Sequence, residues 1–572
     1  MKRIIRYITC AFILSAAICA CSKEHMTDVN TDKSKPSSID PNTQLTTALL
    51  QTYGDFGMMD TYRSYITGFT QHMAGSWNVS NYGGSVHAQD DQMSLIWDKL
   101  YAVAIKNLVD GISRTDEDSN INGALRTHRA YLMSVLTDTY GDVPCSEAGL
   151  GYLEHIANPK YDRQEDIYNW LFTELEKSIE SLAKGTDRVY GDVSSYNGDA
   201  AKWAKYANSL RMRFAMRISD VNPAKAKEEF EKSLKASCGY ISSASEDMYI
   251  KYMNAPFTLY DGSRDLDFRA NALGEILYGQ DFNSPSHICA TFYDILNNSG
   301  DPRLFRYVRH YNNVLRSQIS ADDQGNIDLT EEFHAYLKSI NAKAECCKVG
   351  AAWYDEYPAN IPSVDAIPTL KAAVEANPGK GLEKSDPMAH LTRPSYAIAF
   401  EKADCPGMLM TYAEVEYLLA EAKTLGWNVS GEAAEHYYAG VRASMQQLNS
   451  YYSIDPIQDS EIEAYINANP FNAAKAREQI NTQAWILHIV NPNEAWANMR
   501  RSDYPVLVDR TQRPKFKFTY DDPDLSTPNR LRYPLLEMEY NSASYQEALE
   551  RLGGKDDWHK RVWWDTADGH FE

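Results

Sequence analysis

One stretch of the chain combines aromatic rings with small polar neighbours, which is the chemistry of a binding loop. Trp77 and Tyr82 lie in the segment Gly75-Ser-Trp-Asn-Val-Ser-Asn-Tyr-Gly-Gly-Ser85. Small neighbours leave a ring face accessible, and the amide of Asn78 can donate and accept hydrogen bonds beside it. This loop can hold a sugar ring or a peptide. The alternative is that Trp77 folds back over the preceding helix as a core residue.

Two further segments mix aromatic and polar residues in the same way. The stretch from Phe282 to Tyr293 contains Asn and Ser before an expected helix, and Arg393 is followed closely by Tyr396. Binding pockets are lined by rings with a few polar groups, so we include all four residues as candidate ligand contacts.

The sequence lacks the motifs of the common catalytic sites. It contains no G-x-S-x-G, no G-x-x-x-x-G-K and no H-E-x-x-H, which are typical of serine hydrolases, nucleotide-binding loops and zinc proteases. A glycosidase needs only two carboxylates around one sugar, and 78 acidic residues leave that alternative open.

Metal sites are not expected either. Five oxygen-bearing side chains surround Gly325 in the stretch 321–332, but their spacing misses the EF-hand pattern, and a solvated acidic loop is the commoner outcome. They are Asp322, Asp323, Asn326, Asp328 and Glu331. The six cysteines after residue 21 are scattered and form no C-x-x-C pair, which favours buried thiols, with one long-range disulfide as the alternative. We therefore predict no metal and no cofactor.

The first residues predict a secretory leader with a lipid attachment site. Basic residues precede an apolar run from Tyr7 to Ala20 that is too short to be a permanent membrane span. The run ends in a small residue followed by Cys21, which resembles a lipobox whose cysteine is acylated. We predict a signal peptide at 1–20, lipidation of Cys21, and a polar, flexible tether at 21–41.

Helical periodicity dominates the following part of the chain. Segments 43–56, 89–112 and 123–140 have helical patterns, and apolar residues from Ile167 to Leu182 recur at intervals of three and four. Two hairpins are clear, one at about 203–237 with a break at Asn222-Pro223 and one at 415–445 with a glycine-bounded turn. Such recurring pairs resemble tetratricopeptide units.

These patterns predict an all-α fold with one domain at 42–572. Helix pairs form a scaffold mainly in 42–240 and 408–447, while Gly, Pro, Asn and Asp punctuation predicts a loop-rich capping region at 241–407 and 448–572. The net charge of -21 is spread along the chain, which argues against nucleic acid as a partner.

Several segments of the chain are similar to blocks of the SusD/RagB family of outer-membrane lipoproteins, in the same order. They are Tyr140–Ala148, Ala207–Asp220, Met410–Ala422, Asn498–Pro505, Arg532–Pro534 and Arg561–Asp565. Within these blocks, Arg211, Arg213 and Arg217 alternate with apolar residues, so we expect them to form ion pairs beside a packed helix. The terminal Trp563 and Trp564 are expected to be packing residues.

The resemblance implies a scaffold of four tetratricopeptide-like helix pairs and a nutrient-binding protein that is not an enzyme. It also implies a lipid-anchored, surface-exposed position at the outer membrane and docking on a SusC/RagA-like TonB-dependent transporter. We expect an oligomeric ligand, a glycan in preference to a peptide. A secreted helical carbohydrate-active enzyme and a surface adhesin without a transport role are the alternatives.

Overall fold

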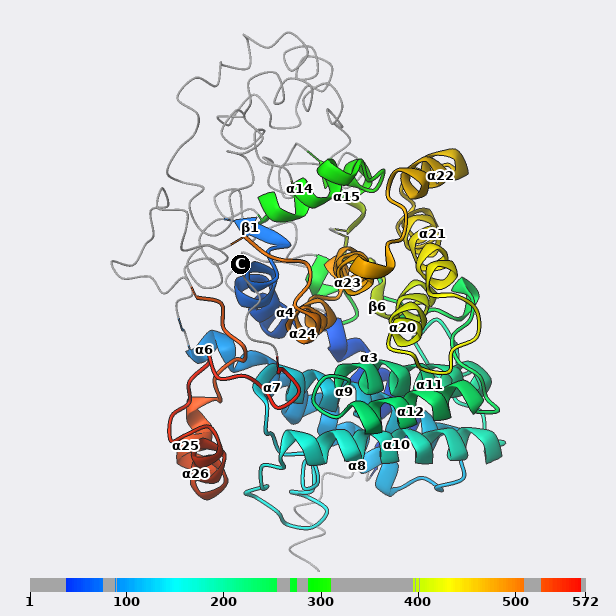
Figure 1. Cartoon of the computed structure of the whole chain (residues 1–572). Coiled ribbons are helices and arrows are strands. Elements are labelled where there is room, and N and C mark those ends of the chain that lie inside the picture. Colours follow the sequence, from blue (N-terminus) through cyan, green and yellow to red (C-terminus); the bar gives the residue numbers. More distant parts are fainter. Residues whose placement is uncertain are drawn as a thin grey trace, which may run out of the picture.

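Stacked helix pairs form most of the described structure, a computed structural model (Figure 1). It describes residues 38–75, 88, 90–254, 268–274, 286–309, 395–396, 398–400, 402–508 and 526–566. Within these residues, four helix pairs succeed one another: α3 (Pro41–Gly54) with α8 (Lys106–Ser113), α9 (Asn120–Tyr140) with α10 (Gln164–Lys184), α11 (Ala200–Arg217) with α12 (Pro223–Lys235), and α20 (Tyr412–Thr424) with α21 (Ala433–Tyr452). The predicted all-α fold is confirmed.

Shorter helices connect and extend these pairs. Between α3 and α8 lie α4 (Phe56–Thr61), the π-helix η1 (Tyr62–Ile66), α5 (Thr67–Phe69), α6 (Asp90–Met93), α7 (Leu95–Lys99) and the π-helix η3 (Leu100–Ile105). Single 3-10 turns include η4 (Ala244–Glu246), η10 (Ile398–Phe400) and η11 (Ala473–Lys475). The helices α14 (Ala290–Ser299) and α15 (Leu304–Tyr307) lie above the scaffold in Figure 1.

Helices continue after α21, in a segment that was predicted to be loop-rich with short helices. They are α22 (Asp459–Ala468), α23 (Ala476–Leu487), the 3-10 turn η12 (His488–Val490), α24 (Pro492–Ser502), α25 (Leu535–Tyr540) and α26 (Ser542–Arg551). Their fully buried side chains include Trp485 and Trp496. Packing against the core thus stabilises short helices whose sequences carry little helical signal of their own.

The helix ends follow local capping chemistry. Asn222 accepts a hydrogen bond from the backbone of Lys225, and Pro223 occupies the first turn of α12, so the predicted break is confirmed. Thr411 caps α20 in the same way, and Glu432 and Glu435 form a reciprocal capping box at the start of α21.

Three two-stranded antiparallel sheets join segments that are distant in the sequence. β1 (Met73–Gly75) pairs with β3 (Ser286–Ile288), β2 (Met248–Ile250) with β6 (Gly407–Met410), and β4 (Val308–Arg309) with β5 (Ser395–Tyr396). Gly407 is required in β6, since a Cβ atom there would lie 2.7 Å from the ring of Tyr53 and 2.8 Å from that of Tyr252. The close approach of two tyrosines thus fixes β6 onto α3.

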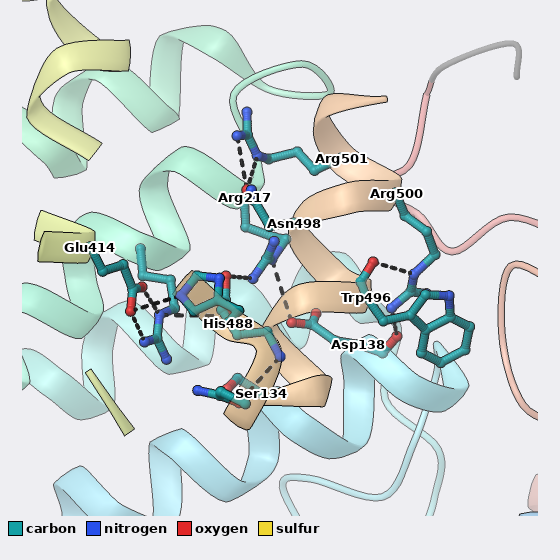
Figure 2. Close-up of polar contacts among 12 residues, drawn as sticks. Ser134, Asp138, Arg217, Glu414, His488, Trp496, Asn498, Arg500 and Arg501 are labelled. Carbon is teal, nitrogen blue, oxygen red and sulfur yellow. Dashed lines mark hydrogen bonds and ion pairs between the residues drawn. The ribbon is translucent and has the colours of Figure 1, made fainter. Parts of the chain in front are cut away.

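Buried ion pairs hold the helix pairs together at the centre of the molecule (Figure 2). Arg213 of α11 donates to both carboxylate oxygens of Glu414 on α20, at 2.6 and 2.7 Å. One turn later, Arg217 donates to Glu494 of α24 at 2.5 Å and lies 3.5 Å from Asp138 of α9. Three helices from distant parts of the chain therefore meet the charged face of α11.

Two more arginines extend this arrangement. Arg501 of α24 forms a two-pronged ion pair with Glu421 of α20 at 2.8 and 2.7 Å, and Arg211 pairs with Glu229 of α12. The expectation that the arginines of α11 form ion pairs is confirmed, but their side chains are buried and face other helices. Burial raises the pKa of Glu414, but the charge and hydrogen bonds of Arg213, together with the His488 ring whose Nε2 lies 3.3 Å from the carboxylate, outweigh burial, so the net pKa is lowered.

Breaking the central pair leaves a buried carboxylate without its cation. We expect Arg213→Met to lower the free energy of unfolding by about 3 to 5 kcal/mol, because Glu414 loses its principal partner and Glu494 a second one. Lys184→Met, which removes the exposed pair between Lys184 and Asp118, should cost far less, because water screens an exposed ion pair. Urea unfolding of both variants measures the difference, and equal losses would contradict a structural role for the buried pair.

Candidate functional site

The acidic residues at the centre of the fold form a structural cluster and do not surround a substrate-sized space. Glu414, labelled in Figure 2, and Glu494 each accept hydrogen bonds from arginine. Asp138, in the same cluster, accepts from the hydroxyl of Tyr168 at 2.6 Å. The cavity beside Glu414 and His488 has a volume of about 10 Å³, which is room for about one water molecule. These carboxylates stabilise the scaffold.

Buried ring contacts and hydrogen bonds hold the residues that directly precede β1. The ring of His72 is stacked on Trp485 of α23 with 4.3 Å between centroids, and it meets the ring of Phe292 of α14 edge-on at 5.5 Å. A ring nitrogen of His72 lies 2.9 Å from the carbonyl oxygen of Trp485, and the indole of Trp485 donates to the carbonyl of Thr70 at 3.0 Å. This buried stack fixes the direction in which β1 leaves the scaffold.

Gln71 completes this base with its amide group. Its Nε2 donates to the carbonyl of Val508 at 2.8 Å, and its Oε1 accepts from the backbone N–H of Val508 at 3.2 Å and from the hydroxyl of Thr291. Gln71 has a φ of 55°, a left-handed conformation that costs a non-glycine residue about 1 to 2 kcal/mol. The three hydrogen bonds offset that cost, and a strained residue held in this way is characteristic of functional regions.

The β1–β3 pair brings two of the sequence candidates to one place. Gly75, the last residue of β1, lies opposite Ser286, the first residue of β3. Trp77 follows Gly75 by two residues and Phe282 precedes Ser286 by four, so the strand ends that border these two segments lie side by side at the same end of the sheet. We call this end the β1–β3 edge.

The third candidate segment reaches the same neighbourhood. β5 contacts β3, and within the β4–β5 pair Tyr396 lies opposite Val308. Arg393 precedes β5 by two residues. Three segments separated by about 100 to 200 residues therefore meet around the β1–β3 edge, which makes this edge the candidate ligand site.

The structure describes only part of the predicted set. Tyr293 lies on α14 with its ring buried in the core, 1% exposed, so in this structure it is a packing residue. Its position differs from the expectation because α14 turns its apolar face, which includes Phe292 and Leu296, into the molecule. Tyr396 lies in β5. Outside the described residues are Trp77, Asn78, Tyr82, Phe282 and Arg393, as is the acidic stretch 321–332.

Other sequence candidates are part of the core. Trp564 is fully buried and donates to Asp138 at 2.9 Å, as expected of a packing residue. Cys145, Cys289 and Cys405 are buried thiols. Among the residues that the structure describes, no three His, Cys, Asp or Glu side chains gather as metal ligands would.

The residues that build the base of the edge were not singled out by any sequence pattern. His72, Gln71 and Trp485 act through contacts between segments about 410 to 440 residues apart. A histidine and a glutamine directly before a short strand give no local signal of such contacts, and only the aromatic composition of the following loop pointed to this region.

Comparison with known proteins identifies related chains. A SusD-like family model described as "Starch-binding associating with outer membrane" matches residues 33–350 and 369–534. A solved SusD-like structure from Bacteroidetes AC2a is 37% identical, with a TM-score of 0.81, over 92% of this chain and 100% of that one. A structure described as a chitin-binding protein is 30% identical, with a TM-score of 0.71 and the same coverage of both chains.

A SusD homologue from Bacteroides uniformis, 23% identical with a TM-score of 0.64 over 92% of this chain and 99% of that one, shares the fold. A search of curated protein sequences found no match. None of the helices in the described ranges combines the length and the hydropathy of a membrane span.

The buried stack at the base of the β1–β3 edge should make stability depend on pH. Burial lowers the pKa of His72 from 6.5 to about 3, against the hydrogen bond to Trp485. The unfolded chain therefore takes up a proton that the folded chain excludes, and stability is lost as pH falls from 6.5 towards 3. Between pH 6.5 and pH 4, we expect His72→Gln to lose about 3 kcal/mol less of its free energy of unfolding than the original chain does.

The matched control for this change is His436→Gln, whose effect has the opposite sign. The hydrogen bond with Glu416 raises the pKa of His436, so its contribution is present at low pH and is lost as pH rises through its folded pKa. Denaturant unfolding at pH 4, 5, 6 and 7 gives the slopes of both variants. A slope for His72→Gln identical to that of the original chain would show that His72 is not held neutral.

Proposed function

This chain belongs to the SusD-like family, and from that membership we propose that it captures an oligosaccharide at the cell surface and passes it to an outer-membrane transporter. The observation that carries the proposal is the 30% identity, over 92% of the chain, to a solved chitin-binding protein. The family description, starch binding in association with the outer membrane, supports the same class of ligand.

The geometry of the β1–β3 edge supports capture by loops on a rigid base. Gln71 and His72 fix the point from which the Trp77 loop departs, and Ser286 fixes the point at which the Phe282 segment returns. A rigid base lowers the entropy cost of ordering a binding loop when the ligand arrives. We propose Trp77, Asn78, Tyr82, Phe282, Arg393 and Tyr396 as the ligand contacts around this edge.

In the proposed mechanism no bond is broken and no cofactor takes part. Aromatic rings lie against the C–H faces of sugar units, and amide and guanidinium groups hydrogen-bond to their hydroxyls. Binding of this kind is weak for each unit and reversible, which suits a protein that must release its cargo. The partner is a SusC/RagA-like TonB-dependent barrel, which receives the oligosaccharide from the bound chain.

Calorimetric titration with chitotetraose, maltoheptaose and a mixed peptide pool tests this function. We expect an oligosaccharide to bind and the peptides not to bind, and we expect Trp77→Ala to weaken oligosaccharide binding at least tenfold, since a ring at the centre of a site contributes about 2 kcal/mol or more. The melting temperature should change little, because a ring that contacts ligand contributes little to the core.

Tyr152→Ala is the matched control for Trp77→Ala. Tyr152 is 85% exposed on the turn between α9 and α10, so its removal should change neither affinity nor stability. If Trp77 is instead a core residue, Trp77→Ala should lower stability by about 3 to 5 kcal/mol. Binding of peptides alone, or unchanged oligosaccharide affinity in Trp77→Ala with a normal melt, would contradict the proposed ligand or the proposed contact respectively.

We further propose that Cys21 carries the lipid that holds the chain at the outer membrane. Expressed with its leader in a bacterium that processes lipoproteins, the chain should fractionate with membranes, and Cys21→Ala should release it. Cys19→Ala, two residues earlier in the same leader, should leave the anchor intact. Mass spectrometry of the mature N-terminus reads the modification directly, and a membrane-bound Cys21→Ala chain would show that something else anchors the protein.

A further inference from the structure

A hollow lies beside α20 and α21, two helices that Figure 1 shows on the opposite side of α23 from β1. It has a volume of about 410 Å³ and is formed by the first turn of α20, one face of α21 and the turn before β2. This volume falls within the range of small-molecule sites, about 300 to 1,000 Å³. Figure 1 shows α21 on the right and β1 on the upper left, so the two places are separate.

The face of α21 explains why a hollow exists there. The residues of α21 that line it recur at intervals of three and four and therefore lie on one side of the helix. They are Ala439, Arg442, Ala443, Gln446, Gln447, Ser450 and Tyr451. Two of them are alanines, whose small side chains leave the space between α21 and the η4 turn unfilled.

Asp247, 4% exposed, fixes the wall of the hollow. Its carboxylate accepts hydrogen bonds from the backbone N–H of Tyr412 at 2.6 Å and from the hydroxyl of Tyr451 at 2.7 Å. The ring of Tyr451 is tilted against that of Tyr249, with 5.1 Å between centroids. Tyr412 and Tyr451 are half-buried, so part of each ring is open beside a fixed polar wall.

The charges around the hollow already have partners. Arg442 pairs with Glu463, and its second nitrogen donates to the same carboxylate at 3.2 Å. Burial raises the pKa of Asp247 to about 7 despite its two hydrogen bonds, so its charge is partly neutralised at neutral pH. A ligand here therefore meets hydroxyl and amide groups rather than a counter-charge, which favours a neutral, hydroxyl-rich molecule.

The rim of the hollow offers hydrogen-bonding groups to a ligand. The hydroxyls of Ser242, Ser243 and Ser450 can both donate and accept, and the side chain of Gln446 is exposed beside them. Gln447, 6% exposed, lies between this hollow and the small cavity beside Glu414.

We propose that this hollow is a second carbohydrate subsite, which takes one neutral sugar unit between Tyr412, Tyr451 and the polar face of α21. The class of ligand rests on the proposed function, whereas the position and lining rest on the contacts above. Two subsites on one rigid scaffold let a long glycan chain bind at both, and the second contact raises the affinity for polymer far more than for a short oligomer.

The test uses the full mature chain and two probes, chitobiose and soluble glycol chitin. Ala443→Trp places a large ring in the hollow, and Asn449→Trp places the same ring at an exposed position of α21 outside it. We expect calorimetry to report two chitobiose sites for the original chain and one for Ala443→Trp. Retention by glycol chitin in affinity electrophoresis should fall at least tenfold in Ala443→Trp and stay unchanged in Asn449→Trp.

A milder variant keeps the test valid if the large ring disturbs folding. Gln446→Ala combined with Ser450→Ala removes two exposed hydrogen-bonding groups of the hollow and should weaken the same site. A single chitobiose site that is lost in Trp77→Ala and kept in both hollow variants would overturn the second subsite and leave the proposed function standing. If neither probe binds the original chain, both the subsite and chitin-type glycan binding are overturned.

Discussion

The buried arginines of α11 and α24 are the interaction on which the rest of the structure depends. Arg213, Arg217 and Arg501 each pair with a carboxylate from another helix, and the partners come from α9, α20 and α24. Charges removed from water are costly unless each finds its counter-ion in good geometry. The helix pairs are thereby held in one relative arrangement, which an apolar core alone specifies less strictly. Arg303 is a further buried arginine of this kind. It pairs with Asp301 and donates to Ser444 of α21 and to Gln483 of α23.

This arrangement links the scaffold to the candidate site. The α23 helix that contributes Gln483 also contributes Trp485, whose ring supports His72 at the base of β1. Gln71 then ties the same base to Thr291 at the start of α14 and to Val508. The β1–β3 edge is therefore an integral part of the packed scaffold. Its geometry is determined by the same helices that the ion pairs align, and a change in their packing would alter the point from which both candidate loops depart.

Features set by neighbouring residues could be predicted from the sequence, whereas contacts between segments far apart in the chain could not. The hairpins α11–α12 and α20–α21 could be predicted because apolar stripes, caps and turn residues lie within the elements themselves. Ion pairs could be expected for Arg213, but its partner Glu414 lies 201 residues away and nothing local identifies it. The loop composition around Trp77 predicted a binding region, whereas nothing local indicated that Gly75, which precedes this loop, pairs with Ser286, which follows the Phe282 segment. Tyr293 was chosen for its loop neighbours, and the apolar face of α14 decided its burial.

The hydrogen bonds of the Gln71 side chain determine which part of the chain can be altered without disturbing β1. Its three hydrogen bonds all go to groups outside the loop that follows β1, two of them to backbone atoms of Val508. The anchor is thus independent of the identity of the loop residues, and loop length itself costs little once the ends are fixed. The loop can therefore be replaced by one with different rings and polar groups while the same anchor is kept, and such a change requires no redesign of the helices beneath it.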